Sequence, residues 1–348
     1  MHDGDAGRRT RRVVLGSETC SGRGVPRCHF ASVANSWPRY CRSTLKISEF
    51  TTSQLASLLR RSELLFTMGP LVARIKSNVT SLASDIALMY ADFDVCSVDA
   101  FADFHIEVAR ETGLRRWIKP QVRFFFDGQP SFIPLPAAQA FAMLEWGLNW
   151  CVAAHCHQYL IIHAAVIEKE GRAAILPAPP GSGKSTLCTG LVMRGRRLLS
   201  DELALYDMES GMIYGMSRPI NLKNKSIDVI KRFAPSAVMT APMPDTTKGT
   251  VALLRPPLNS VLCANEPVRP LWIILPKYSP DARPDLVPYS RARTFMLIAE
   301  QSFNYDIQGV RGFEAIGKLV DQGQCYQLTY SQLDDAQRVF DELLARGG

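Results

Sequence analysis

The chain lacks any apolar run long enough to cross a membrane as a helix. Of its 348 residues, 47% are hydrophobic, so a substantial core is expected. The longest candidate, residues 137–162, is interrupted by Glu145, Asn149, His155, His157 and Gln158. It therefore stays short of the roughly 18 consecutive apolar residues of a membrane span. We expect a soluble, cytoplasmic protein with no membrane partner.

The chain also lacks the cysteine spacings of a zinc or redox site. Its nine cysteines are scattered without a CxxC pair, and Cys151 and Cys156 are too far apart to form one. Structural zinc sites and thioredoxin-like motifs need such pairs. The pattern favours reduced thiols, as is usual inside cells.

Positive charge is scarce outside the N-terminal segment. The formal net charge is +7, but residues 1–45 hold eight arginines against three acidic residues, which leaves only +2 for the rest. A basic binding face for nucleic acid is therefore not expected. Residues 1–45 also lack apolar periodicity and a signal-peptide core. We interpret them as a disordered extension or as sequence upstream of the true start, near Leu45; a basic arm for an acidic partner is the alternative.

Residues 46–135 form a strand-rich N-terminal portion in this interpretation. Alternating apolar residues and turn signals predict strands through most of 64–134. The predicted features are a hairpin around Gly69-Pro70 in 64–75, strands at 101–108 and 121–126, and a turn at Asp127-Gly128.

Residues 136–348 read as mixed α/β. Phe141, Leu144, Leu148 and Val152 recur at helical spacing, which predicts a helix over 136–156. Further helices are predicted at 185–194, 224–233, 290–301 and 309–320, and from about 331. Strands are predicted at 159–167, 172–177, 197–206, 271–276 and 325–330. Residues 242–257 are rich in proline and predict a loop.

One segment carries most of the functional information, because it follows a predicted strand and opens a predicted helix. Ala178-Pro-Pro-Gly-Ser-Gly-Lys-Ser185 matches the phosphate-binding loop GxxxxGK[ST] in every fixed position but the first. Glycines let backbone N–H groups turn toward phosphate oxygens, the lysine reaches the β and γ phosphates, and the serine hydroxyl ligates Mg²⁺. A helix N-terminus adds positive potential. The predicted ATP-binding residues are Pro180, Gly181, Ser182, Gly183, Lys184, Ser185 and Thr186.

The first position of this motif holds Ala178 in place of glycine. Alanine can serve there if its φ is negative, since only positive φ values require glycine. The alternative is a surface turn that happens to end in Lys-Ser-Thr, but its position between a strand and a helix argues against that.

Two acidic residues follow the loop. Asp201 and Glu202 lie seventeen and eighteen positions after Lys184, enough for one helix and a returning strand. Phosphoryl transfer requires a carboxylate on the metal and often a second one to accept the proton of the attacking hydroxyl. We expect Asp201, with Ser185, to hold Mg²⁺. The alternative is a solvated acidic turn.

The other candidates are cationic. His163 lies on a predicted apolar strand before the loop, where a lone histidine is usually a core residue. Arg218, Lys223, Lys248 and Arg255 occupy downstream loops and are candidates to neutralise a transferring phosphoryl group. We favour Lys248, because Gly249 beside it allows close backbone approach. Trp146, Asn149 and Trp150 are assigned to the helix core.

These segments together resemble a known family. The runs His163-Ala-Ala-Val, Gly181-Ser-Gly-Lys-Ser and Arg194-Gly-Arg-Arg-Leu-Leu-Ser-Asp-Glu look like the C-terminal kinase domain of HPr kinase/phosphorylase. The closer similarity is to the HprK-related kinase A family, and it extends over nearly everything after residue 60. It includes Glu145-Trp-Gly-Leu-Asn-Trp, Arg218-Pro-Ile-Asn-Leu-Lys-Asn and Lys248-Gly-Thr.

The resemblance implies a compact fold like that of phosphoenolpyruvate carboxykinase and an ATP- and Mg²⁺-dependent kinase. It implies that Asp201 and Glu202 are the paired carboxylates and that His163 lies near the γ-phosphate. The sequence departs from HPr kinase/phosphorylase in two respects: it has Glu at the second acidic position, and it lacks the ExRGLG signature. The resemblance therefore does not extend to phosphorylase activity.

The favoured hypothesis is phosphoryl transfer to a hydroxyl, a serine of a protein or peptide, by a protein that could form a homo-oligomer. Two hypotheses stay open beside it: a nucleotide-binding regulatory or scaffold protein without phosphotransfer, and a small-molecule kinase or carboxykinase-like enzyme. DNA binding is the weakest, because the positive charge lies in residues 1–45.

Overall fold

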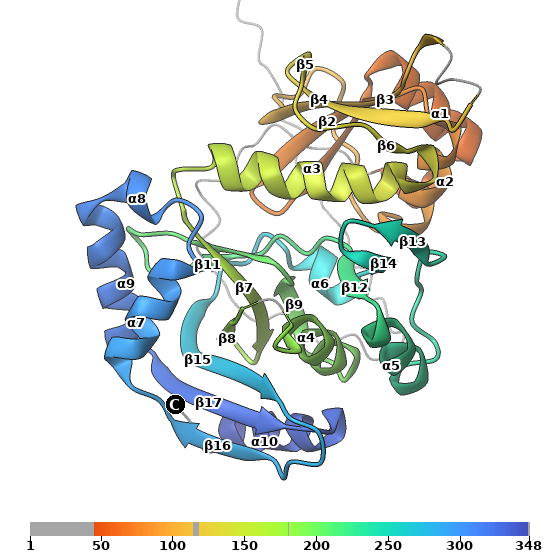
Figure 1. Ribbon diagram of the computed structural model, residues 1–348. Helices are drawn as coiled ribbons and strands as arrows, with labels where there is room; N and C mark the ends of the chain where they lie inside the picture. The colour runs from red at the N-terminus through yellow and green to blue at the C-terminus, as the bar shows by residue number, and fades with distance from the viewer. Residues whose placement is uncertain (1–44, 114–117, 180, 347–348) are drawn as a thin grey trace, which may run out of the picture. The chain divides into compact units, whose positions relative to one another are not determined.

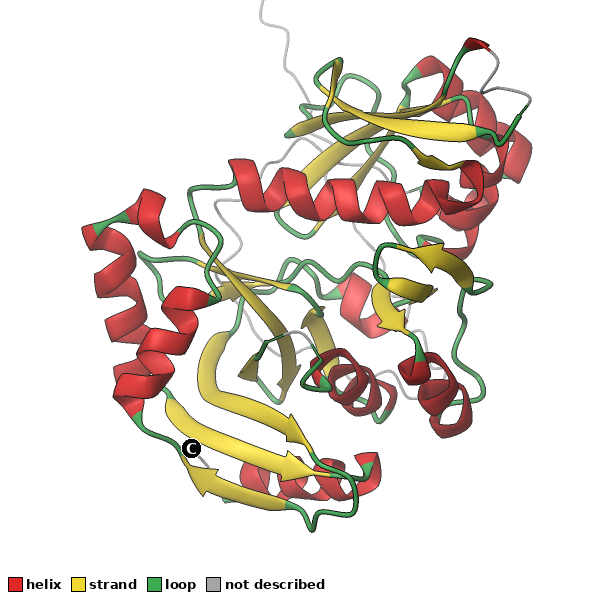
Figure 2. Cartoon of the chain, viewed as in Figure 1, coloured by secondary structure: helices red, strands yellow, loops and turns green. Residues whose placement is uncertain are grey.

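The computed structural model describes residues 45–113, 118–179 and 181–346, all within one unit that spans Ser36–Gly348. In these segments three β-sheets are combined with helices, which confirms the predicted α/β class (Figures 1 and 2). Apart from Leu45, the interpretation of residues 1–45 concerns residues outside those described.

The first sheet has the strand order β1-β2-β3-β4-β5, with β6 also paired to β4. Its strands are β1 (Leu64–Met68), β2 (Leu71–Ser77), β3 (Phe104–Arg110), β4 (Gln121–Phe126), β5 (Gln129–Pro130) and β6 (Leu135–Pro136). The predicted hairpin around Gly69 is confirmed by the β1–β2 pairing. The turn between β4 and β5 is confirmed at Asp127 and Gly128, which both have positive φ.

The prediction of strands through most of 64–134 is wrong for residues 80–89, which form a helix. A 3₁₀ helix (Ile47–Glu49) and α1 (Thr52–Arg61) precede the sheet, and α2 (Thr80–Met89) follows β2. Strands β2 and β3 are parallel, so the chain must cross over between them, and a helix is the usual crossover. Helix α2 makes that connection and buries Leu82 and Ile86.

Helix α3 (Ala140–His155), preceded by a 3₁₀ turn (Ala137–Gln139), contacts β3 and β4 of this sheet (Figure 1). It approaches closely at Gly147, where an added Cβ would lie 2.0 Å from the Phe124 ring. Phe141 and Leu148 share a core with Leu203 and Leu205 farther along the chain. The helix therefore joins the N-terminal sheet to the phosphate-loop region.

The second sheet carries the loop. Its order is β11-β10-β7-β8-β15-β17-β16, with β9 paired to β7. The strands are β7 (Leu160–Lys169), β8 (Arg172–Pro177), β9 (Arg197–Ser200), β10 (Leu203–Tyr206), β11 (Ile213–Tyr214), β15 (Arg269–Tyr278), β16 (Asp285–Pro288) and β17 (Gln324–Tyr330). Strand β8 is antiparallel to β7 and parallel to β15, which is parallel to β17. The carboxyl ends of β8, β15 and β17 therefore share one edge.

Helices cover both faces of this sheet. Alternate residues of β8 enter different cores: Ala174 and Leu176 pack with one, and Ala173 and Ile175 with the other. Helices α4 (Lys184–Met193), α5 (Lys225–Phe233) and α10 (Leu333–Ala345) contribute to the first core, and α7 (Arg291–Glu300) and α9 (Val310–Gln322) to the second. Short helices α6 (Leu258–Leu262) and α8 (Tyr305–Gln308) complete the set in the described segments.

Two predictions about the strands are corrected. The single strand predicted over 197–206 is divided into β9 and β10 at Asp201 and Glu202. The loop predicted over 242–257 contains β13 (Met243–Thr246) and β14 (Gly249–Leu254), which form a three-stranded sheet with β12 (Ile220–Lys223). The prolines led to the prediction of a loop. However, β13 is an edge strand, which is hydrogen-bonded on one side only, so Pro244 is tolerated there although it lacks an N–H.

Four cysteines, Cys151, Cys156, Cys188 and Cys325, are free and buried, whereas Cys96 is disulfide-bonded. The expectation of reduced thiols is therefore correct for those four and wrong for Cys96. No helix among the residues described combines the length and apolarity that a membrane crossing requires.

Candidate functional site

The phosphate-loop motif connects the end of β8 to the start of α4, as predicted. Gly181 and Gly183 have φ values of +86° and +88°, which L-residues with a side chain rarely adopt. At Gly183 an added Cβ would also lie 2.7 Å from the Tyr330 hydroxyl, which donates to the Gly183 carbonyl at 3.2 Å. Around Gly181 the corresponding space is open. Pro180, the remaining predicted loop residue, lies outside the described residues.

Ala178 fits the start of this loop. It is buried, and it is not among the residues with positive φ. The condition set from the sequence is therefore met, and the missing first glycine costs the loop no backbone strain.

Lys184 begins α4 and carries a charge without a partner. The residue is only 7% exposed, and its Nζ has no hydrogen-bond partner among the described residues. Burial lowers the pKa of its ammonium to about 8, although Glu202 and Asp201 oppose this. Ser182 Oγ is likewise buried without a described partner. Ser185 and Thr186 follow in the first turn, where backbone N–H groups lack intrahelical acceptors.

Asp201 and Glu202 lie between β9 and β10, at a break in the hydrogen-bonded pairing of these strands with β7. Ser200 pairs with Val166 and Leu203 pairs with His163, and the two acidic residues between them belong to neither strand. Side chains at such a break are released from the strict alternation of a strand. Both carboxylates lie within electrostatic reach of Lys184.

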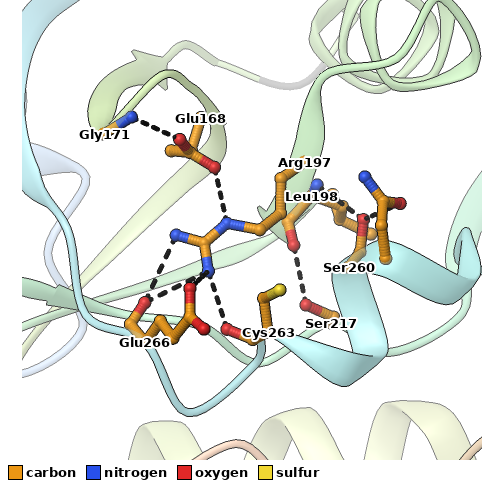
Figure 3. Close-up of polar contacts among 9 residues, drawn as sticks. Glu168, Gly171, Arg197, Leu198, Ser217, Ser260, Cys263 and Glu266 are labelled. Carbon is orange, nitrogen blue, oxygen red and sulfur yellow. Dashed lines mark hydrogen bonds and ion pairs between the residues drawn. The ribbon is translucent and has the colours of Figure 1, made fainter. Parts of the chain in front are cut away.

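Strand β9 is fixed in place by Arg197 (Figure 3). The guanidinium donates to Glu168 Oε2 at 2.6 Å and to the carbonyls of Cys263 at 2.7 Å and Glu266 at 3.3 Å. The next residue, Leu198, donates its N–H to Ser260 and accepts from Ser217 at its carbonyl. Arg197 is thus a structural residue that holds the strand leading to the acidic pair.

The two carboxylates have different surroundings. Asp201 Oδ2 accepts the N–H of Asn221 at 2.9 Å, and Glu202 Oε2 accepts from Asn149 Nδ2 at 2.8 Å. Burial, and after it the charge of Glu202, raises the pKa of Asp201. Burial also acts to raise the pKa of Glu202, but the surrounding cations, Lys248 foremost, outweigh it and lower that pKa. Glu202 is therefore ionised at neutral pH.

His163 lies on β7 within electrostatic reach of Glu202 and Lys184. Its Nδ1 is 3.2 Å from Gln301 Oε1, and its ring is 5.8 Å from that of Phe303. Burial, and then the charge of Lys184, lowers the pKa of His163, so the imidazole is neutral at pH 7. It can act there as a hydrogen-bond partner and not as a fixed positive charge.

Two further lysines face the acidic pair. Lys248 lies in the turn between β13 and β14, with its ammonium 5.0 Å above the Trp146 ring. The residue is exposed, yet its ammonium is partly desolvated, which lowers its pKa. Lys223, at the end of β12, also acts on Glu202. Neither lysine forms an ion pair with a described residue. Arg255, by contrast, pairs with Asp92 at 2.5 Å.

The sequence interpretation missed the role of α3. Asn149 was assigned to the helix core, but its amide bonds to Glu202 and to the Arg218 guanidinium. Trp150 does belong to an aromatic cluster with Phe126 and Phe132. The available signal was the spacing of Glu145 and Asn149, two polar residues four apart on an otherwise apolar helix, which places them on one face.

Asp201 and Ser185 are the residues of this site that the sequence predicts as metal ligands. In the described segments, no group of three or more His, Cys, Asp or Glu side chains is arranged to hold a metal ion. Mg²⁺ in phosphoryl-transfer enzymes is typically held by one or two carboxylates plus the substrate phosphates. Asp201 and Ser185 fit that pattern. A surface recess lined by Arg196, Trp272 and Phe340 shares no residue with this site.

The site thus combines a glycine loop, a buried unpaired ammonium, two carboxylates and two further unpaired lysines. No protein-family model matches the chain, and no curated protein matches it either.

Proposed function

We propose that this protein is an ATP- and Mg²⁺-dependent kinase that transfers a phosphoryl group to a hydroxyl. The observation that carries the proposal is the Lys184 ammonium, which is buried at the end of the glycine loop with no hydrogen-bond partner among the described residues. An unpaired buried charge is costly, so such a group is retained where a ligand supplies the opposite charge. A triphosphate in the loop supplies it.

The remaining residues have separate roles. Asp201 acts electrostatically on Lys184 and Cys188 of α4, and Asp201 and Ser185 would hold Mg²⁺. When bound, the ion would neutralise charge on the β and γ phosphates. Lys248 and Lys223 would neutralise the transferring group. A neutral His163 whose Nδ1–H faces Gln301 Oε1 keeps only an acceptor at Nε2, so it would accept a hydrogen bond in the site and not donate one to a phosphate.

Glu202 accepts the proton in this mechanism. The acceptor hydroxyl oxygen forms a bond to the γ phosphorus, and the bond between that phosphorus and the β–γ bridging oxygen breaks. The hydroxyl proton passes to the Glu202 carboxylate, and the bridging electron pair leaves with ADP. Glu202 is ionised, so it has a lone pair free to accept the proton. Positioning then supplies most of the rate.

The resemblance to the HprK-related kinase A family supports a serine of a protein or peptide as the acceptor. The test is to incubate the purified protein with γ-labelled ATP, Mg²⁺ and cell lysate and to follow the label. We expect label on a protein or peptide serine, and none with Lys184→Ala or Asp201→Asn. Tight ATP binding with no transfer and no hydrolysis would refute the kinase and favour a regulatory nucleotide-binding protein. Label on a small molecule would correct the acceptor alone.

A further inference from the structure

A chain of buried polar contacts leads from the N-terminal portion to the acidic pair. Tyr90, at the end of α2, donates its hydroxyl to Glu145 Oε1 at 2.5 Å. The other oxygen, Glu145 Oε2, is 3.2 Å from Arg218 Nη1. Arg218 Nη2 bonds to Asn149 Oδ1, and Asn149 Nδ2 donates to Glu202 Oε2 at 2.8 Å. Each group in this chain orients the next.

The amide of Asn149 is held in one orientation. A guanidinium can only donate and an ionised carboxylate can only accept, so Oδ1 must face Arg218 and Nδ2 must face Glu202. Flipping the amide would set two donors against each other at Arg218 and two acceptors against each other at Glu202. Asparagine is thus the residue type that joins this cation to this anion without adding charge.

The ion pair behind Asn149 is itself deeply buried. The side chains of Arg218 and Glu145 are only 6% and 4% exposed. Pairs at this depth lose so much hydration that they are weak contributors to stability. A positional role for the pair explains its place beside the site better than stability does. It fixes Arg218, which has electrostatic contact with both Asp201 and Glu202.

We propose that Asn149 is a positioning residue that holds Glu202 for proton transfer, with Arg218 and Glu145 fixing its orientation. The inference rests on the proposed kinase function. Asn149 binds one oxygen of the Glu202 carboxylate, and the second oxygen is left to receive the acceptor's proton. It acts through Glu202 and not on the nucleotide, so its loss lowers kcat and leaves KM for MgATP unchanged.

Two substitutions at this position separate positioning from structure. Asn149→Ala removes both bonds. Asn149→Asp keeps a partner for Arg218, now as an ion pair, but sets a carboxylate against Glu202. A purely structural role predicts that aspartate is tolerated at least as well as alanine. The positioning role predicts the opposite order for turnover. Asn304→Ala is the matched control, because Asn304 is a buried asparagine whose amide, among the described residues, bonds to the backbone of Ile161 and Tyr159.

The experiment measures MgATP turnover, with water or the labelled acceptor, and the thermal unfolding of each variant. We expect kcat to fall about tenfold in Asn149→Ala and about a hundredfold in Asn149→Asp, with KM for MgATP within about twofold of wild type. Asn304→Ala should lower the unfolding temperature and leave kcat unchanged.

Three results would overturn the inference alone while wild type remains active: Asn149→Asp as active as wild type, Asn149→Asp more active than Asn149→Ala, or a rise in KM with kcat unchanged. If Asn149→Ala does not fold, the comparison of Asn149→Asp with wild type decides. A wild-type protein that turns over no MgATP would overturn the proposed function, and this inference with it.

Discussion

Replacing Lys184 by methionine should stabilise the protein and abolish its binding of nucleotide. Methionine keeps most of the side chain's length and removes the ammonium that has no described partner. Burial lowers the pKa of Lys184 from 10.5 to about 8. Each unit of pKa corresponds to about 1.4 kcal/mol, so burying the charged form costs about 3 kcal/mol at neutral pH.

The sign of the pH dependence follows from the lowered pKa. Below about pH 8 the lysine is charged in both the folded and the unfolded chain, and the folded state bears the whole cost. Between about pH 8 and 10.5 the folded chain loses the proton first, so the cost disappears as the pH rises. The free energy of unfolding of Lys184→Met should therefore exceed that of wild type by up to about 3 kcal/mol at pH 7, and the gap should close toward pH 10.

Urea unfolding of the two proteins at pH 7 and pH 9.5, with and without MgATP, measures both effects. Wild type should gain about 2.7 kcal/mol when MgATP is at a hundred times its Kd, and Lys184→Met should gain nothing. Lys225→Met, which changes an exposed lysine at the start of α5, is the control and should stay within about 0.5 kcal/mol of wild type. A Lys184→Met protein less stable than wild type at pH 7, or a gap that does not narrow with pH, would refute the reasoning.

Four other substitutions test separate parts of the site. Asp201→Asn should lower turnover at least about a hundredfold and remove the Mg²⁺ dependence of ATP binding in titrations with and without the ion; unchanged turnover would contradict the metal assignment. Gly183→Ala should destabilise the fold by more than about 1 kcal/mol in urea and prevent ATP binding, because φ is +88° and the Tyr330 hydroxyl leaves no room, whereas Gly181→Ala meets only the backbone strain and should cost less. Lys248→Ala should lower kcat about tenfold to a hundredfold with little change in the unfolding temperature, since the residue is exposed; unchanged kcat would remove it from the site.

The parts of the fold that the sequence predicts well are those set by local patterns. The apolar residues of β8 and the glycines before Lys184 specify strand, loop and helix within one short segment. Asp127-Gly128 likewise specifies a hairpin, since both residues adopt positive φ. In each case the residues that decide the structure are neighbours in sequence, so no knowledge of distant contacts is needed.

Other elements were missed although local signals were present. Helix α1 begins with a reciprocal cap between Thr51 and Gln54, a pattern that marks a helix start. Strands β13 and β14 were hidden by the prolines in and around them, and the tolerance of Pro244 depends on β13 lying at a sheet edge. Sheet order is a tertiary property, so that tolerance could not be read from the sequence.

The residues of the candidate site also differ in whether the local sequence predicts them. Lys184, Asp201 and Glu202 are predictable because one helix and one strand connect them. Asn149 and Arg218 lie far apart in sequence and meet only because α3 packs against the strands that carry the acidic pair. The identity of the Glu202 partner therefore depended on the fold.

Charge pairing distinguishes this site from the rest of the described chain. Arg197 pairs with Glu168, Arg255 with Asp92 and Arg218 with Glu145, so each of these three buried or partly buried arginines is neutralised by a carboxylate. Lys184 is more deeply buried than Arg255 and has no such partner, although two carboxylates lie within electrostatic reach. Those carboxylates are instead held by Asn221 and Asn149. Among the described residues the carboxylates nearest to Lys184 are bound by other groups, so a phosphate in the glycine loop, as proposed, would supply the charge opposite to the ammonium.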